Sequence, residues 1–262
     1  MQETSLYSIV MIPARMASTR LPGKPLADIG GEPMIVRVWR QAEAAGLGPV
    51  VVAAAEREIA EAVEAAGGKA VLTDPALPSG SDRIAAALKV ADPLGLFGVV
   101  VNVQGDVPTL PPEYLRICAE ALVRADADIA TLAAPIRSEE ELNNPNVVKA
   151  VAPLSWQEVA LAEDFVRALP EDYHGPAFHH IGIYAYRRQA LERFISLPPS
   201  LRERQHKLEQ LRALDAGMRI AVARVPEAPF GVDTPAELEY VRRQVEHGHG
   251  HGPVDDNGEA RP

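Results

Sequence analysis

The chain has 262 residues, of which 47% are hydrophobic and 24% charged, a balance typical of a folded globular protein that excludes disorder throughout. Its net charge of −10 argues against a broad nucleic-acid-binding surface, and no apolar run approaches the roughly 20 residues of a membrane-spanning helix. The N-terminus has no basic region before an apolar stretch, so it does not resemble a secretory signal peptide. The single cysteine, Cys118, excludes an intramolecular disulfide and a cysteine-based zinc cluster. We therefore expect a cytoplasmic protein without membrane association.

The first half of the chain alternates Val- and Ile-rich runs with amphipathic stretches. Apolar residues recur at helical spacing within residues 34–45 and again within 59–66. The runs that we expect to form strands are residues 8–13, 49–53 and 98–103. Strand and helix in alternation predict a parallel sheet with helices on both faces. The almost wholly apolar run 98–103 predicts a central strand, buried on both sides.

The second half shows more strand and less helix. Three strand-like runs follow one another and predict a mixed β insertion, at residues 129–134, 147–151 and 180–186. A helix is expected over 201–214 and a last strand over 220–225. The final helix opens with a capping box, in which Thr234 caps the helix and Glu237 stands three residues later. The tail 247–262, rich in Gly and His, is expected to be disordered.

The loop after the first strand concentrates positive charge in an acidic chain. Residues 13–25 hold Arg15, Arg20 and Lys24, together with small residues whose backbone amides can face a phosphate. In a doubly wound sheet, ligands bind beyond the carboxyl ends of the strands, which is where this loop lies. Neither GxxxxGK[ST] nor GxGxxG occurs in the sequence. Position and charge together favour triphosphate binding over a merely solvated basic loop.

Two aspartates are candidates for a metal site. Asp106 follows a Gly at the end of the buried strand, where a carboxylate can either bind Mg²⁺ or cap the next helix. Asp233 stands just before the final helix, at what we expect to be a second strand end, and Thr234 already caps that helix. If both strands end at one edge of the sheet, the carboxylate of Asp233 is available to complete a site with Asp106. Mg²⁺ is usually held by one or two carboxylates plus substrate phosphates.

Seven segments, in order, resemble those of the 3-deoxy-manno-octulosonate cytidylyltransferase family. They are PARMASTRLPGKPL (13–26), SGSDR (79–83), NVQGD (102–106), NPNVVK (144–149), HHIGIYAY (179–186), LEQLR (208–212) and GVDTP (231–235). LPGKPL and a QGD-like turn occur across sugar nucleotidylyltransferases, whereas the combination with HxGIYxY and LEQLR is much more specific. The resemblance covers residues 8–245.

The resemblance implies an α/β nucleotide-diphospho-sugar transferase fold: a central mixed, mostly parallel sheet with helices on both faces and a β insertion. It places this domain at 1–246, with the sugar-acid-binding and dimerisation insertion at 130–215. It also implies a cytoplasmic homodimer that transfers CMP from CTP to the sugar acid with Mg²⁺, for lipopolysaccharide synthesis.

The family's functional positions carry over residue by residue. The positions matching catalytic residues are Arg15, Lys24 and Asp106, and those matching metal ligands are Asp106 and Asp233. The nucleotide-binding positions are Ala14, Arg15, Lys24, Ser79, Gly80, Arg83 and Gln104. The sugar-acid positions are His180, Tyr184, Glu209 and Gln210.

Without the resemblance, the sugar-acid positions have plainer interpretations. Tyr184 in an apolar strand is more often a core residue, and Glu209 and Gln210 on a helix would form a solvated face. His179 and His180 alternate between the faces of a strand, so at most one can point at a ligand, and we favour His180.

Several positions depart from the family's pattern. They are Ala54 and Ala55 in place of a polar pair, Val107 in place of an acid, a shortened segment around Val166, and His206 in place of a Glu. These changes fall near the expected base and sugar-acid regions. They leave open two alternatives: a cytidylyltransferase for another acidic sugar, such as an amino-Kdo or a capsule-type acid, and a catalytically silent nucleotide-binding homologue.

Overall fold

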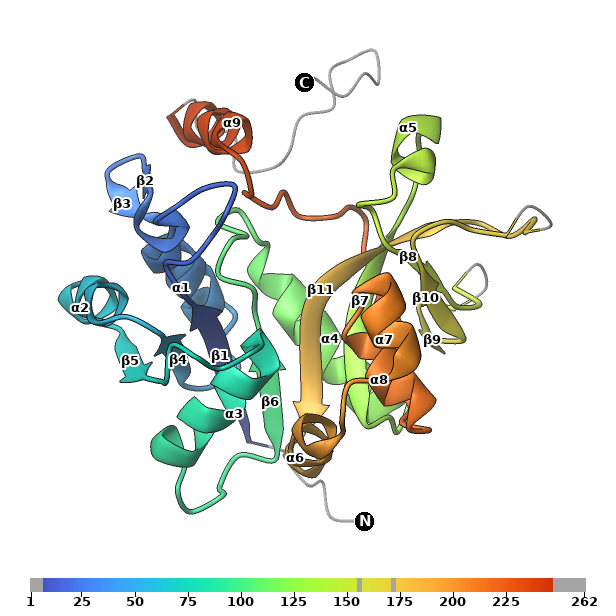
Figure 1. Cartoon of the computed structure of the whole chain (residues 1–262), viewed down its shortest axis with the longest axis horizontal. Coiled ribbons are helices and arrows are strands. Elements are labelled where there is room, and N and C mark those ends of the chain that lie inside the picture. The colour runs from blue at the N-terminus through green and yellow to red at the C-terminus, as the bar shows by residue number, and fades with distance from the viewer. Residues whose placement is uncertain (1–6, 155–156, 171–172, 247–262) are drawn as a thin grey trace.

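The computed structural model describes residues 7–154, 157–170 and 173–246. Within them, one ten-stranded sheet forms the centre of the molecule (Figure 1). Its main path, in spatial order, is β5 (Lys69–Leu72), β4 (Val50–Ala54), β1 (Ser8–Ala14), β6 (Val99–Asn102), β11 (Phe178–Arg187), β7 (Ile129–Pro135), β12 (Ile220–Arg224) and β9 (Val159–Leu161). Two short strands, β8 (Lys149–Val151) and β10 (Asp164–Val166), leave this path and pair beside β11.

Strand direction divides the sheet. β5, β4, β1 and β6 run parallel, as the alternating pattern of the first half predicts. β11 is antiparallel to both of its main neighbours, β6 and β7, and β12 is parallel to β7. Two of the three strands that the sequence analysis placed in an insertion, β7 and β11, therefore lie in the middle of the sheet. The expected α/β fold with a mixed, mostly parallel sheet is confirmed.

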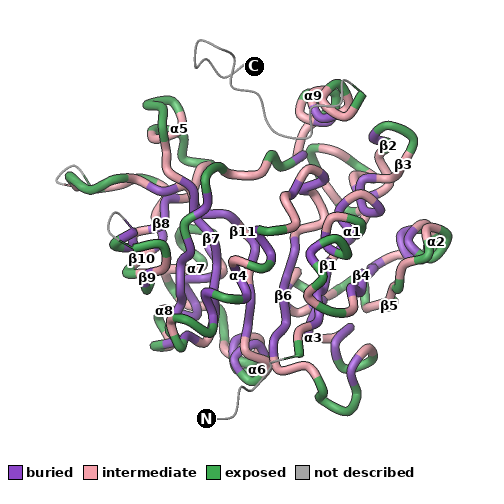
Figure 2. The backbone as a smooth tube through the Cα atoms, turned by 180° about the vertical axis from the view of Figure 1, so that it is seen from behind, coloured by how far each residue is buried: buried purple, intermediate pink, exposed green. Residues whose placement is uncertain are grey.

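Helices cover both faces of the sheet. α1 (Met34–Ala44), α2 (Arg57–Ala65) and α4 (Pro112–Arg124) pack on one face, and α3 (Gly80–Ala91), α6 (Arg188–Ser196) and α8 (Gln210–Asp215) pack on the other. The alternation along β1 shows the cause, because Val10 and Ile12 belong to the first apolar layer while Ile9 and Met11 belong to the second. The central strands are consequently buried over most of their length (Figure 2).

The remaining elements lie around the rim. The short hairpin β2 (Asp28–Ile29) and β3 (Glu32–Pro33) packs with α9 (Pro235–Glu246) in a separate small apolar cluster. The 3-10 helix η1 (Lys24–Leu26) precedes the hairpin, α5 (Glu139–Asn143) follows β7, and α7 (Leu201–His206) leads into α8. None of the helices in the described ranges is long and apolar enough to cross a membrane.

The structure confirms all seven predicted strands to within two residues at each end. It also confirms the capping box of α9, since Glu237 N donates to Thr234 Oγ1 at 3.3 Å and Thr234 N donates to Glu237 Oε2 at 2.8 Å. The single helix expected over 201–214 is wrong. The chain breaks into α7 and α8 at Lys207, whose φ of 55° is left-handed and ends the first helix. The tail 247–262 lies outside the described residues.

A buried ion pair fixes the turn between α3 and β6. The carboxylate of Asp92, 2% exposed, accepts from the backbone amides of Leu96 and Phe97 and from Arg188. Because these hydrogen bonds stabilise its charged form more than burial disfavours it, the pKa of Asp92 is lowered. The same Arg188 also contacts Glu192, which is 60% exposed, at 3.4 Å.

This pair gives a matched test of buried against exposed charge. Asp92→Ala leaves the amides of Leu96 and Phe97 without their acceptor and removes the buried carboxylate that pairs with Arg188. We therefore expect a loss of about 3 kcal/mol in the free energy of unfolding. Glu192→Ala removes a solvated partner and should cost below about 1 kcal/mol. Urea denaturation of the two variants checks this, and equal losses would contradict the assignment of Asp92 as the anchor of the turn.

Candidate active site at the carboxyl ends of β1 and β6

The neighbouring parallel strands β1 and β6 end at the same edge of the sheet, where a cleft of about 380 Å³ opens. Its walls come from the loops after both strands and from the start of α3. The lining residues are Pro13, Ala14, Arg15, Ala17, Ser18, Thr19, Arg20, Lys24, Pro25, Leu77, Ser79, Gly80, Arg83, Gln104, Gly105 and Asp106. A volume of this size is typical of small-ligand sites.

Glycines allow the walls to approach closely. A Cβ at Gly105 would lie 3.0 Å from the carbonyl oxygen of Pro13, tighter than ordinary contact. A Cβ at Gly80 would lie 3.3 Å from Cγ of the same Pro13. The loop after β6 and the N-terminus of α3 can therefore both pack against the end of β1 only because these positions have no side chain.

One ammonium joins the two predicted metal ligands. Lys24 Nζ donates to Asp106 Oδ2 at 2.7 Å and to Asp233 Oδ1 at 2.9 Å, although these aspartates lie 82 and 209 residues away along the chain. Arg20 Nη2 donates to the other oxygen of Asp233, Oδ2, at 2.7 Å. Both carboxylates thus converge on a single cationic atom.

The electrostatics of this centre favour full ionisation. Burial lowers the pKa of Lys24, but the two carboxylates outweigh burial and the pKa is raised. Burial likewise raises the pKa of Asp233, but Lys24 and Arg20 outweigh it and the pKa is lowered. A charged lysine and a charged carboxylate are therefore both stabilised at neutral pH.

The route by which Asp233 reaches the site differs from the simplest expectation. It does not stand at a strand end, because β12 ends at Arg224 and the chain then crosses the edge of the sheet before α9 (Figure 1). Val232 N donates to the carbonyl oxygen of Asp106 at 2.9 Å, which joins the crossing segment to the loop after β6.

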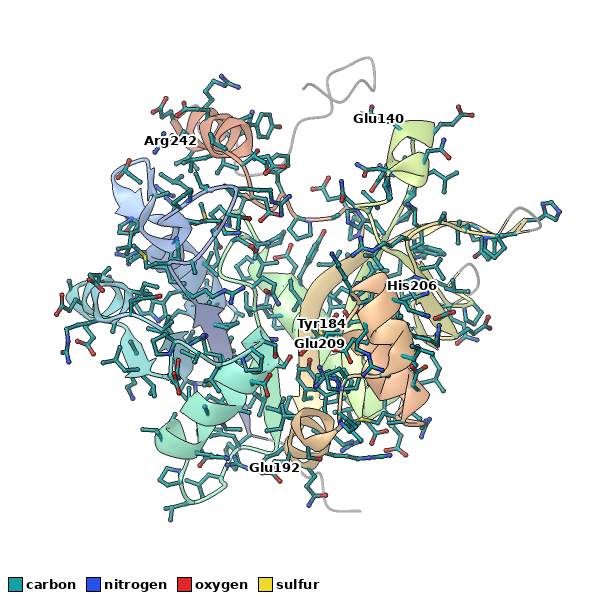
Figure 3. All side chains as sticks on the ribbon, viewed as in Figure 1. Glu140, Tyr184, Glu192, His206, Glu209 and Arg242 are labelled. Carbon is teal, nitrogen blue, oxygen red and sulfur yellow. The ribbon has the colours of Figure 1, made fainter. Side chains whose placement is uncertain are left out.

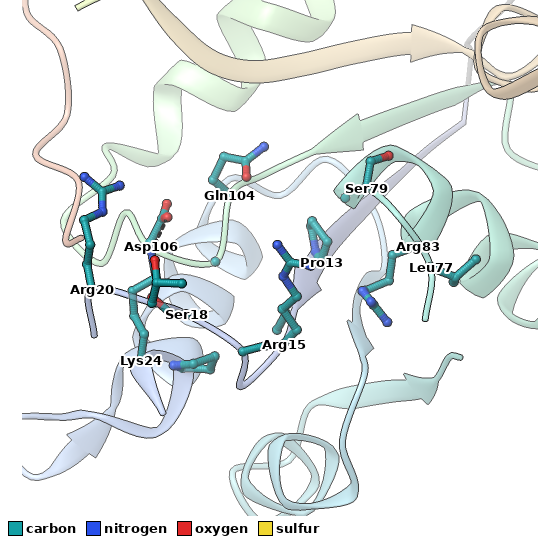
Figure 4. Close-up of a pocket in the computed structure, with 16 residues that line it drawn as sticks. Pro13, Arg15, Ser18, Arg20, Lys24, Leu77, Ser79, Arg83, Gln104 and Asp106 are labelled. Carbon is teal, nitrogen blue, oxygen red and sulfur yellow. Dashed lines mark hydrogen bonds and ion pairs between the residues drawn. The ribbon is translucent and has the colours of Figure 1, made fainter. Parts of the chain in front are cut away.

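The basic loop is itself held by an acid. Met16 N donates to Glu56 Oε2 at 2.9 Å, and Ala55 N donates to the carbonyl oxygen of Ala14. Glu56 is the residue just before α2, and sequence reasoning did not identify it as a site residue. Its position after an apolar strand was the available signal. Arg15 itself is exposed and lines the cleft between Lys24 at one end and the start of α3 at the other (Figure 4).

The start of α3 forms the opposite end of the cleft from Lys24 and Asp106 (Figure 4). Ser79 caps this helix, accepting from Asp82 N at 3.1 Å. Arg83 is only 2% exposed, and its guanidinium donates to Thr73 Oγ1 at 2.6 Å and to the carbonyl oxygens of Asp74 and Pro75. Arg83 thus holds the turn before α3, and burial lowers its pKa.

Gln104 joins the cleft to β11. Its Nε2 donates to the carbonyl oxygen of Gly182 at 3.2 Å, at the irregularity in the pairing between β11 and β7. The next paired residue of β11, Tyr184, lies opposite Asn102 of β6.

The four predicted sugar-acid residues lie beside this cleft rather than in its walls. Glu209 lines a second hollow of about 590 Å³, and Ser79 lines both. Ser81 Oγ donates to Glu209 Oε2 at 2.9 Å, while Glu209 Oε1 is buried and has no hydrogen-bond partner among the described residues. Burial raises the pKa of Glu209. Gln210, the next residue, is 6% exposed.

His180 and Tyr184 are neighbours on β11. The ring centroids of His180 and Tyr184 are 5.6 Å apart, and Phe165 packs edge-on against His180 at 4.8 Å. The imidazole Nε2 of His180 lies 3.0 Å from Thr131 Oγ1. Tyr184 lies close to Glu209, the residue just before α8 (Figure 3), and burial raises the pKa of the Tyr184 hydroxyl. His179 instead pairs with Glu141 at 2.8 Å.

The positions that depart from the family's pattern lie in two regions, the apolar core and the elements β10 and α7. Ala54, Ala55 and Val107 are buried in the apolar core, where polar side chains would need partners. Val166 pairs with β8, and the carbonyl oxygen of His206 accepts from Arg167 Nε at 2.8 Å.

The sequence matches that of known nucleotidyltransferases over most of its length. The family described as Cytidylyltransferase matches residues 9–220. The chain is 62% identical to the 3-deoxy-manno-octulosonate cytidylyltransferase of Parvibaculum lavamentivorans, over 92% of this chain and 93% of that one. It is 57% identical to the 3-deoxy-manno-octulosonate cytidylyltransferase of Paramagnetospirillum magneticum, over 90% and 97%.

Two solved structures share the fold. A CMP:2-keto-3-deoxy-manno-octonic acid synthetase complexed with CTP superposes with a TM-score of 0.84 and 36% identity, over 92% of this chain and 99% of that one. A cytidylyltransferase from Leptospira borgpetersenii superposes with a TM-score of 0.60 at 17% identity, over 92% and 87%, and shares the fold alone.

Burial of His180 predicts a pH dependence of stability. Burial lowers its pKa from 6.5 to about 3. Between these two pH values the imidazole is protonated in the unfolded chain and neutral in the folded chain. The associated stability is complete above pH 6.5 and is lost as the pH falls towards 3. Between pH 7 and pH 5 this histidine alone should cost about 2 kcal/mol.

Urea denaturation at the two pH values tests this. His180→Phe should lose markedly less stability on acidification than the wild type, whereas His206→Gln, which removes an exposed imidazole, should behave as the wild type does. An unchanged pH dependence in His180→Phe would show that its imidazole is not buried in the neutral form.

Proposed function

Because the chain belongs to the 3-deoxy-manno-octulosonate cytidylyltransferases of the cytidylyltransferase family, we propose that it transfers CMP from CTP to the anomeric hydroxyl of 3-deoxy-manno-octulosonate, releasing pyrophosphate. The observation that carries the proposal is the centre at the end of β6, where two carboxylates from distant loops converge on one cation beside a basic cleft. A triphosphate needs positive charge along its length, and a bound metal needs oxygen ligands.

The cleft supplies an extended row of groups for CTP. Arg15 and Lys24 lie where they can neutralise the charge that develops on the leaving pyrophosphate. Ser79 caps α3 and Gly80 opens it, and the N-terminus of a helix favours an anion. We propose that Gln104, which lines the cleft, lies near the cytidine. Arg83 would act through the turn that it holds, since its guanidinium donates to residues 73–75.

The donor set at Asp106 and Asp233 fits a hard divalent cation. The ammonium of Lys24 stands in for one, because both carboxylates already direct an oxygen at it within hydrogen-bond distance. We propose Mg²⁺ as the ion, held by these two carboxylates and by the phosphates. When bound, it would neutralise phosphate charge and lower the pKa of the attacking hydroxyl.

The acceptor site is proposed on the other side of Gln104, between β11 and α8. His180 stays neutral there, since its pKa is about 3, and can take part in hydrogen bonds without adding charge. Tyr184 keeps its hydroxyl proton, and Oε1 of Glu209, which lies 3.7 Å from Arg212 Nη2 but accepts no hydrogen bond, can accept one from a sugar hydroxyl. Gln210 completes the set. Catalysis would then depend on positioning and electrostatics, without a covalent enzyme intermediate.

The wider setting follows from the same proposal. The product would serve lipopolysaccharide synthesis, and we propose a cytoplasmic homodimer. The departures at Val166 and His206 lie near the acceptor side, so the preferred acid needs a direct comparison. A panel of acidic sugars, including an amino-Kdo, assayed with CTP for pyrophosphate release, identifies the substrate. CTP binding without release from any of them would indicate a silent homologue.

Asp106→Asn tests the metal assignment. The variant keeps the side chain's shape but removes a negative ligand, so we expect turnover to fall by at least about 1,000-fold, as for loss of a main electrostatic group. Circular dichroism and thermal unfolding should show an intact fold. Asp126→Asn, at a side chain 83% exposed, is the control and should keep full activity. Full activity in Asp106→Asn would overturn the assignment.

A further inference from the structure

The centre of the site is already neutralised before any substrate binds. Asp106 and Asp233 contribute two negative charges, and Lys24 and Arg20 contribute two positive charges within 2.9 Å. Lys24 is the shared partner, and its side chain is only 15% exposed, against 62% for Arg20. A lysine shielded from water, between two carboxylates, interacts with them more strongly than it would at the surface.

A divalent cation that used both carboxylates would need the place that the ammonium holds. Lys24 Nζ lies 2.7 Å from one carboxylate oxygen and 2.9 Å from the other, so a third group cannot bind these same two oxygens without moving it. Free metal therefore has to compete with the ammonium of Lys24, and its binding requires that Lys24 give up its ion pairs with Asp106 and Asp233.

We propose that Lys24 is a removable counter-ion that keeps the carboxylate pair closed to free metal and opens it when the triphosphate arrives. This inference rests on the proposed function, whose reaction it deepens by assigning an order: the divalent ion enters with the nucleotide or after it. No bond is made or broken in this exchange. The ammonium passes from two carboxylates to phosphate oxygens, and the metal takes its place.

The local structure permits this exchange. Lys24 opens η1, where its backbone N donates to the carbonyl oxygen of Leu21 at 3.2 Å and its carbonyl oxygen accepts from Ala27 N at 3.1 Å. The backbone is therefore held, while the four-carbon side chain can move. The cleft extends from Lys24 past Arg15 to the start of α3, so a triphosphate lying in it would offer acceptors next to the ammonium. Arg20 continues to neutralise Asp233 on its other oxygen.

Binding of Mn²⁺ to the protein without nucleotide tests the proposal. Electron paramagnetic resonance measures free Mn²⁺ during titration of the wild type, Lys24→Met and Lys24→Arg. Lys24→Met removes the competing charge at similar length and should bind Mn²⁺ at least about tenfold more tightly than the wild type, a difference of 1.4 kcal/mol. Lys24→Arg keeps a cation and should bind as weakly as the wild type.

Two further variants show where the gained affinity comes from. Lys89→Met removes the same charge from an exposed position of α3 and should leave Mn²⁺ affinity unchanged. Adding Asp106→Asn to Lys24→Met should abolish the gain. Thermal unfolding gives a second readout. Lys24→Met should melt below the wild type without metal, because Asp106 loses its ion pair and Asp233 keeps only the one with Arg20. Mn²⁺ should raise the melting temperature of Lys24→Met more than that of the wild type.

Equal Mn²⁺ affinity in Lys24→Met and the wild type would overturn the proposal, as would a gain that survives Asp106→Asn. These outcomes are separate from failure of the proposed function. If the proposed function itself is wrong, wild-type protein will release no pyrophosphate from CTP with any sugar acid, whatever its affinity for Mn²⁺. If the wild type is active but Lys24→Met binds Mn²⁺ no more tightly than the wild type, the counter-ion role is wrong and the proposed function still stands.

Discussion

The site depends on one electrostatic constraint: two carboxylates that both stay ionised repel each other unless a cation lies between them. In this structure that cation is the ammonium of Lys24, which accounts for the pairing of three loops that are remote in sequence. The loop after β1 supplies the lysine, the loop after β6 supplies Asp106, and the segment that crosses to α9 supplies Asp233. With Arg20 included, the cluster is neutral, so removing Lys24 leaves an excess negative charge and removing either carboxylate leaves an excess positive charge.

The sheet brings these loops together and adds the second half of the site. Parallel β1 and β6 direct their carboxyl ends to one edge, as in other doubly wound sheets. Antiparallel β11, inserted beside β6, places Tyr184 opposite Asn102 and so sets the proposed acceptor residues next to Gln104. α3 and α8 close the arrangement through the Ser81–Glu209 hydrogen bond, which connects the proposed nucleotide and sugar sides.

Sequence reasoning located the chemistry better than the connections that support it. Apolar periodicity identified the main strands because burial on both faces leaves a strong pattern, and the position of Asp106 followed from the strand that precedes it. The break at Lys207 was missed because a left-handed lysine has no signature of its own in an amphipathic run. The hydrogen bonds from Arg83 to the turn before α3, and the one from Met16 N to the Glu56 carboxylate, are tertiary contacts that no local sequence pattern predicts. The convergence of Asp233 was expected, but its route was not, because it arrives on an irregular segment rather than at a strand end.

The most direct test is a crystal structure of the protein with CTP and Mg²⁺ and without the sugar acid. The account predicts a metal ion bound by Asp106 and Asp233 together with phosphate oxygens, and Lys24 Nζ moved from the carboxylates to the triphosphate. Nucleotide bound in the cleft with Lys24 still bridging both aspartates, and the metal elsewhere, would contradict it.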